Sequence, residues 1–133
     1  MLQSFEVQQA LINLPQLTAI VPASHIFCYA VPEEFQKVTD QPVIRIDDIR
    51  GLYNKFASNH AYGAYRTVEI QGWFNSKDVV RADKVRRLVN TACESIAYYN
   101  SYDGGFNIDP NTAELMFTTQ YTKDSVVEDD GMS

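Results

Sequence analysis

The stretch Tyr65-Arg66-Thr67-Val68-Glu69-Ile70-Gln71-Gly72-Trp73-Phe74 alternates between apolar and polar side chains with a period of two. Successive side chains of a β-strand point to opposite faces, so this alternation predicts a strand with one buried face and one wet face. The apolar face holds Val68, Ile70, Gly72 and Phe74, and the polar face holds Thr67, Glu69 and Gln71. This strand decides the class of fold, because a sheet with one apolar face needs a second layer to cover it.

A helix that supplies such a layer follows directly. Asn75 or Ser76 is a suitable N-cap, and we predict that the helix runs to about Ala97. Its apolar residues recur at steps of three and four and predict one buried stripe, formed by Ala82, Val85, Val89, Ala92 and Ile96. Asp83 and Arg87 are four residues apart on the opposite face, in the order that favours an ion pair.

Apolar runs separated by prolines and turn residues predict further elements on both sides of this strand and helix. The first is a helix from about Ser4, a suitable N-cap, to Leu14, where Pro15 halts it. The others are strands at 25–31 and 43–49, a turn at 98–105, and strands at 105–108 and 113–121.

Between two of these strands, Arg50 to Ala64 contains turn-forming residues such as Gly51 and Gly63 together with several aromatic residues. A connection of this length exceeds the roughly 2–5 residues of an ordinary hairpin loop. We therefore predict a long loop between the central strands and regard it as the main contact element of the chain.

Together these elements describe an α+β fold, a mostly antiparallel sheet of four to five strands with two main helices packed on it. A chain of 133 residues has room for one domain, which we place at residues 1–123. Residues 124–133 hold four acidic side chains and no basic one, without any periodic pattern. They are predicted to form an acidic, disordered tail.

The charge balance argues against polyanionic partners. The chain has 11 basic and 17 acidic residues, and 13 acidic residues still face the 11 basic ones once the tail is removed. Without a broad basic field we expect no sequence-specific nucleic-acid partner and no attraction to anionic membranes. We also expect no signal peptide and no membrane-spanning helix. Two cysteines are too few for a disulfide scaffold, which favours a reducing, cytosolic setting.

Candidate metal ligands are sparse. His25 and Cys28 are three residues apart on a predicted strand and so point to opposite faces, where they cannot share one ion. Only Cys93 and His60 could complete a site of nitrogen and sulfur ligands. The sequence therefore predicts no metal centre.

Catalytic signatures are equally sparse. The adjacent carboxylates Asp47 and Asp48 diverge on a strand, which argues against a paired acid and base. Residues 103–114 have the length of a calcium loop, but Ile108 stands where such loops need glycine. The sequence has no nucleophile elbow, phosphate loop or dinucleotide fingerprint. We expect neither an enzyme nor a cofactor.

The N-terminal helix has two apolar faces. Val7 and Leu11 lie on one side, whereas Phe5 and Ile12 fall nearly opposite them. The face with Phe5 and Ile12 could be buried either by another part of the same chain or by a neighbouring subunit.

Three passages carry a resemblance to a known family. The first is Leu17-Thr18-Ala19-Ile20-Val21 with the strand around 25–29. The second is Gln41-Pro42-Val43-Ile44-Arg45-Ile46, and the third is Val68-Glu69-Ile70-Gln71-Gly72-Trp73-Phe74 running into the helix at 79–96. Over about residues 3–122 the chain resembles the tail terminator, or tail completion, proteins of long-tailed bacteriophages and prophages.

Members of that family form a hexameric ring that caps the tail tube, ends its polymerisation and offers a docking surface for the head connector. The resemblance implies a structural protein of the virion tail, assembled in the cytoplasm of a bacterial host. Its partners would be copies of itself, the major tail tube protein and a head connector or completion protein. The long loop is typically mobile in the free subunit and ordered in the ring. The candidate contact residues are Arg50, Tyr53, Lys55, Phe56, His60 and Tyr62 in the predicted loop, with Phe5 and Ile12 as a second patch.

Two other interpretations remain open at this point. One is a different head–tail connector or a minor tail component, and the other is a small-molecule-binding or hydrolytic α+β domain. An acidic body also suits a ring through which DNA slides, because a negative lumen repels phosphate.

Overall fold

The computed structural model describes residues 2–36, 41–57 and 60–126, and the side chains of 50–65 and 124–126 lie outside that description. Three helices and a five-stranded sheet form the α+β fold predicted from the sequence. The helices are α1 (Gln3–Ile12), α2 (Pro15–Thr18) and α3 (Val79–Glu94), with short 3-10 turns at Ala23–His25 and Glu33–Phe35. The strands are β1 (Ile26–Cys28), β2 (Val43–Ala57), β3 (His60–Phe74), β4 (Tyr99–Ile108) and β5 (Leu115–Val126).

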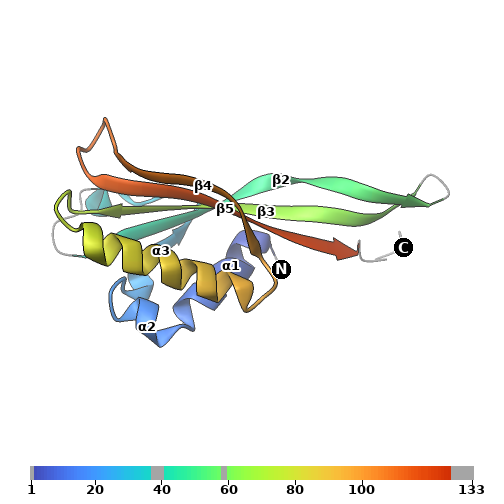
Figure 1. Ribbon diagram of the computed structural model, residues 1–133, viewed down its shortest axis with the longest axis horizontal. Coiled ribbons are helices and arrows are strands. Elements are labelled where there is room, and N and C mark those ends of the chain that lie inside the picture. Colours follow the sequence, from blue (N-terminus) through green and yellow to red (C-terminus); the bar gives the residue numbers. More distant parts are fainter. Residues whose placement is uncertain (1, 37–40, 58–59, 127–133) are drawn as a thin grey trace.

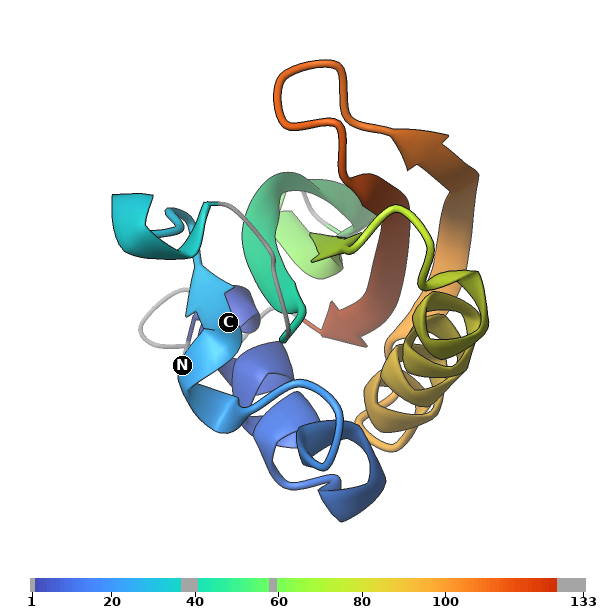
Figure 2. The same ribbon diagram turned by 90° about the vertical axis from the view of Figure 1, so that its left-hand side faces the viewer.

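The sheet has the order β1-β2-β3-β5-β4 and is mostly antiparallel, since only β1 and β2 run in the same direction. All three helices lie on one side of it (Figure 1), and the end-on view in Figure 2 shows them together below the curved sheet. Across the described residues, no helix is long and apolar enough to cross a membrane.

The core lies between β3 and α3, where the sequence pattern places it. Val68, Ile70 and Phe74 are fully buried on the helical side of β3. The stripe on α3 is confirmed, because Ala82, Val85, Val89 and Ala92 are buried and Ile96 packs partly against the core. Burial of these apolar side chains is the main favourable contribution to folding. The predicted ion pair between Arg87 and Asp83 also forms, at 3.2 Å.

Helix α1 differs from its predicted bounds. It begins at Gln3 after Leu2, and Ser4 is a buried residue of the helix, not its N-cap. The prediction of Ser4 as a cap was wrong because the capping carboxylate comes from Asp48 in β2, far away in the sequence. The helix ends at Ile12, and Pro15 begins α2, a position that proline tolerates well.

The predicted long loop at 50–64 is also wrong. Its residues continue β2 and β3, which pair as far as Ala57↔His60, and Ser58 and Asn59 lie outside the described residues. Irregular register at Ile49/Leu52 and Tyr53/Lys55 accommodates the turn-forming residues without ending the strands.

The C-terminal strands are longer than the sequence pattern predicts. Residues 98–105 were predicted as a turn, but Tyr99–Ile108 form β4 with two register shifts against β5. Gly105, with a positive φ of 72°, is accommodated at one of these irregularities. Strand β5 continues to Val126, which pairs with Gly63, so the start of the predicted tail is ordered strand. Residues 127–133 of that tail lie outside the described residues.

A close approach at Gly72 leads to a first prediction. A Cβ atom at this position would lie 2.5 Å from the ring of Phe117, which is buried and stacked on Phe74. Overpacking of this kind costs about 1–3 kcal/mol, so Gly72→Ala should lower the free energy of unfolding by that amount in chemical denaturation. Shortening the clashing ring in the double variant Gly72→Ala/Phe117→Leu should make the two losses less than additive. Strict additivity would contradict the proposed contact.

Candidate functional site

Strands β2 and β3 extend past the helical layer as an arm, and β5 pairs with its root at residues 63–65. Strand β1 pairs with β2 only from Ile44 to Ile46, whereas β2 continues to Ala57. Figure 1 shows the two strands projecting past the helical layer. We call residues 50–57 and 60–65 the arm. Its longer strand, residues 50–57, is about 25 Å long at roughly 3.3 Å per residue.

The arm contains all six contact residues that the sequence predicts between the central strands. The backbone places four of them on β2 and two on β3, so they belong to one hairpin: Arg50, Tyr53, Lys55, Phe56, His60 and Tyr62. Their side chains lie outside the described part of the structure.

Charge distinguishes the arm from the rest of the chain. The arm includes two basic residues, Arg50 and Lys55, and none of the 17 acidic ones. The other nine basic residues therefore share the remainder of the chain with all 17 acids. An aromatic, basic hairpin is thus attached to an acidic body, a contrast that was already readable in the sequence.

The first turn of α1 fastens the root of the arm. The side-chain amide of Gln3 donates to the backbone oxygens of Ile49 in β2 (3.1 Å) and Thr67 in β3 (3.0 Å). The backbone N–H of Ser4 donates to Asp48 Oδ1 at 2.9 Å. A carboxylate at this position satisfies a free N–H of the helix terminus and interacts favourably with the helix dipole.

Asp48 also joins the end of β1 to this junction. The buried Ser4 hydroxyl donates to Tyr29 Oη (2.7 Å) and Asp48 Oδ2 (3.2 Å), and the Tyr29 hydroxyl donates to the same carboxylate. The bond to Asp48 raises the pKa of Tyr29 above its ordinary value. Tyr29 has a φ of 72°, a conformation that is rare for a non-glycine residue and indicates that its surroundings hold it in place.

A third contact reaches the remaining strand of the arm root. Glu6 lies 3.9 Å from Lys123 of β5, and the Lys123 ammonium lies over the buried ring of Tyr98 at 5.5 Å. The first turn of α1 thus contacts β2, β3 and β5 through Gln3, Ser4 and Glu6. These contacts link the helical layer to the base of the arm.

The two residues of the second predicted patch, Phe5 and Ile12, do not lie together in the structure. Phe5 is 41% exposed at the arm root, where its ring packs edge-on against Tyr29 at 6.2 Å. Ile12 packs partly against the core of its own chain at the other end of α1. Phe5 therefore lies near the arm, and Ile12 lies apart from both.

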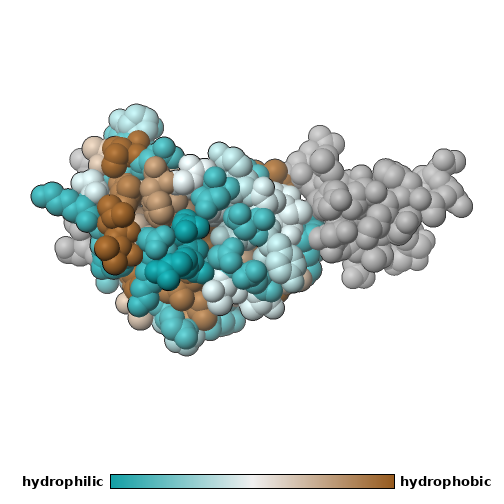
Figure 3. Space-filling view, viewed as in Figure 1, coloured by the Kyte–Doolittle hydropathy of each residue, from teal (hydrophilic) through white to brown (hydrophobic). Residues whose placement is uncertain are grey.

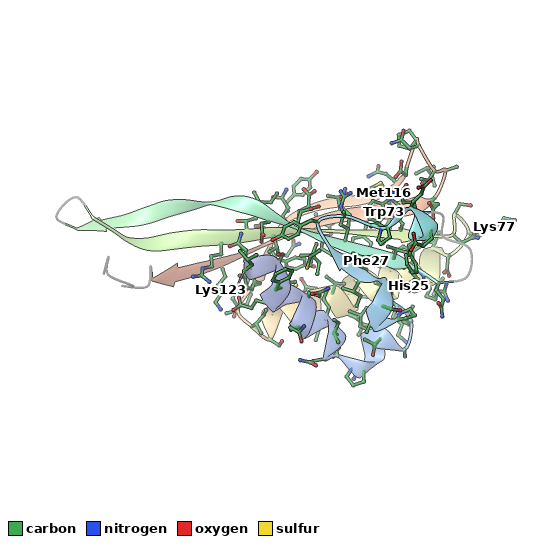
Figure 4. All side chains as sticks on the ribbon, turned by 180° about the vertical axis from the view of Figure 1, so that it is seen from behind. His25, Phe27, Trp73, Lys77, Met116 and Lys123 are labelled. Carbon is green, nitrogen blue, oxygen red and sulfur yellow. The ribbon has the colours of Figure 1, made fainter. Side chains whose placement is uncertain are left out.

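A pocket of about 220 Å³ lies at the opposite end of β2 and β3. We call it the end pocket; it is lined by Val31, Phe35, Gln36, Val43, Arg45, Trp73, Asp109, Asn111 and Thr112. Figure 4 shows Trp73 at the far end of the body from the arm. Figure 3 shows hydrophobic surface at this end, where α3 begins with the exposed Val79 and Val80.

Trp73 organises the end pocket. Its indole N–H donates to Asp109 Oδ2 at 2.9 Å, and the guanidinium of Arg45 lies 5.3 Å from the centre of its ring. The backbone N–H of Asn111 and the indole N–H of Trp73 hold the pKa of Asp109 below its usual value. Sequence reasoning missed this site, because Val31, Trp73 and Asp109 meet only through the topology; the sole signal was that Trp73 is the single tryptophan.

The residues considered for chemistry lie apart. Asp47 pairs with Arg45 at 3.0 Å on the outer face of the sheet, whereas Asp48 points to α1, so their predicted divergence is confirmed. His25 bonds to the Pro42 oxygen at 3.1 Å, and burial raises the pKa of the Cys93 thiol. Within the residues described, no group of three or more His, Cys, Asp or Glu side chains could hold a metal.

No protein-family model matches the chain, and a search of curated proteins gives no match.

The arm-root contacts generate a second prediction. Asp48→Ala removes the acceptor for the Ser4 N–H and hydroxyl, and unsatisfied buried groups cost about 1–3 kcal/mol, so the free energy of unfolding should fall by that amount. Asp47→Ala is the matched control, because it removes a half-exposed ion pair worth less than about 1 kcal/mol. Chemical denaturation measures both losses, and hydrogen exchange should show faster opening near Ile49 in Asp48→Ala only. Equal behaviour of the two variants would contradict the role of Asp48.

A third prediction concerns acid. Folding lowers the pKa of Asp109 from its ordinary value of 3.8. The ionised carboxylate therefore contributes fully to stability above pH 3.8, and this contribution is lost as the pH falls through the lower pKa of the folded state. Trp73 fluorescence should therefore change with a midpoint below pH 3.8, as Asp109 is protonated and its bond to the indole weakens. Asp109→Asn should abolish that transition in the same titration. An identical midpoint in both proteins would assign the change to another group.

Proposed function

We propose that this chain is a structural virion protein of the tail-terminator type. In this proposal, copies associate into a hexameric ring that caps the tail tube, ends its polymerisation and presents a surface to the head connector. Its partners are therefore other copies of the chain, the major tail tube protein and a head connector or completion protein. The ring belongs to the virion tail and assembles in the bacterial host cytoplasm.

The observation that carries this proposal is the anchored arm. An isolated pair of strands is at best marginally stable, so a need to stabilise the body does not explain the length of the arm. Its root, however, is fixed by partly buried hydrogen bonds from Gln3 and Ser4 to β2 and β3. An element that is held rigidly at its base and projects from an acidic body is suited to contact another subunit or the tube.

The competing proposal of a small-molecule or hydrolytic domain has weaker support. The end pocket, at about 220 Å³, is smaller than the roughly 300–1,000 Å³ typical of small-molecule sites. Ser4 is bonded to Tyr29 and Asp48, but it is fully buried, so its hydroxyl is not accessible to a substrate. A different connector or minor tail component fits the same arm and is separated from a terminator by whether the protein binds tail tubes or empty heads.

Assembly gives the direct test. Light scattering should show the purified protein shifting to hexamers as its concentration rises. The arm variant Tyr53→Ser/Phe56→Ser/Tyr62→Ser should lose this shift while keeping its unfolding transition, because the strands of the arm project past the helical layer. Tyr99→Ser/Tyr102→Ser removes exposed aromatic side chains from β4 and should assemble normally. Unchanged assembly of the arm variant would contradict the arm's role.

Electron microscopy of particles made without this protein tests the biological role. A terminator is needed to stop tube growth and to join the head, so its absence should give overlong tails or tubes without heads. Tails of normal length joined to heads would overturn the proposed function.

A further inference from the structure

We propose that the end pocket of one copy holds an aromatic side chain from the arm of the next copy. This inference rests on the proposed ring, and it identifies which two surfaces of the chain meet in it. The occupant is thus a second copy of the same chain.

The positions of the two surfaces exclude a contact within one copy. The pocket includes Val43 and Trp73, at the start of β2 and the end of β3, whereas the arm is formed by the other ends of the same strands. The 14 residue steps from Val43 to Ala57 span about 45 Å at roughly 3.3 Å each. Figure 4 shows this separation, with Trp73 and the arm at opposite ends. A contact between unlike surfaces on two copies is heterologous and generates rings when its rotation closes.

The size and walls of the pocket suit a single large apolar group. Val31, Phe35, Val43 and Trp73 supply apolar wall, and the volume of about 220 Å³ is below that of most small-molecule sites. The indole of Trp73 is already oriented by Asp109 and Arg45, so little ordering is needed when a ring packs beside it. Aromatic side chains in such pockets commonly dominate the energy of an interface.

Charge complementarity indicates which aromatic segment of the chain occupies the end pocket, namely the arm. Glu33 and Glu34 are exposed in the turn that carries the pocket residue Phe35, and Asp109 lies in the pocket wall. Arg45 is the basic residue of the lining, and its guanidinium already binds Asp47 and Gln71. The described margin of the pocket is acidic and favours a basic partner, and the arm combines Arg50 and Lys55 with aromatic residues and no acid.

The structure supplies its own reporter for this contact, since Trp73 is the only tryptophan. As the concentration of the full-length protein rises, Trp73 emission should shift to shorter wavelength over the range in which light scattering reports assembly. The arm variant Tyr53→Ser/Phe56→Ser/Tyr62→Ser should lose both changes together. Assembly with unaltered Trp73 emission would overturn the assignment of the pocket.

Charge exchange tests the pairing of the two surfaces. Glu34→Lys and Lys55→Glu should each weaken assembly by about fivefold or more, and the double variant should recover to within about twofold of the wild type. Glu94→Lys makes the same charge change at an exposed position on α3 and should leave assembly unaltered. Normal assembly of Glu34→Lys would overturn the arm-to-pocket contact without contradicting the proposed hexameric ring. If Glu34→Lys forms rings but fails to bind tail tubes, the pocket belongs to the tube protein, which also overturns it.

The remaining outcomes separate this inference from the function on which it rests. Charge rescue and a Trp73 shift in dimers or open chains would support the arm-to-pocket contact but contradict the hexameric ring. A protein that stays monomeric, with constant Trp73 emission at every concentration, would contradict both.

Discussion

The carboxylate of Asp48 connects the parts of this molecule that would otherwise be independent. It accepts hydrogen bonds from the backbone and hydroxyl of Ser4 and from the hydroxyl of Tyr29. The first helix, the end of β1 and the strand that enters the arm therefore meet at one side chain. Because its partner Ser4 is buried, separating these elements would leave polar groups without partners, which costs more than the bonds themselves contribute.

The two faces of the sheet differ in character. The helical face carries the core, whereas the outer face is polar and its side chains pair across strands. Arg45 bonds to Asp47 and Gln71, and Gln120 donates to Glu69 at 3.0 Å. Such cross-strand pairs stabilise a sheet face that remains wet. The two surfaces that we propose for assembly lie at the two ends of β2 and β3.

The separation of fold and assembly has a physical consequence. The arm and the end pocket lie at opposite ends of the same strands, and they differ in charge and shape. A chain with complementary features at its two ends associates head to tail, and whether the result closes depends on the rotation between neighbours. In the proposed ring, changes in either surface would therefore alter assembly while the core between β3 and α3 is preserved.

The candidate site was predictable only in part. Residues 50–64 were predicted to be a long contact loop from their length and aromatic content. They form strands instead, because cross-strand pairing outweighs the turn preference of residues such as Gly51. Phe5 was identified from the two-faced pattern of its helix, and it lies at the arm root. The end pocket was missed, since its lining comes from four separate segments of the chain that no spacing in the sequence relates.

The sequence by itself determined the α+β class, the burial pattern of β3 and the stripe on α3, because period-two and period-3.6 patterns are local properties of a strand and a helix. Only the tertiary structure decided where α1 begins, since its cap is a carboxylate 44 residues away, and only it decided that β4 and the arm are strands. Those features depend on partners distant in the chain, and the free energy of pairing with them exceeds the local preference of the residues for turns or caps.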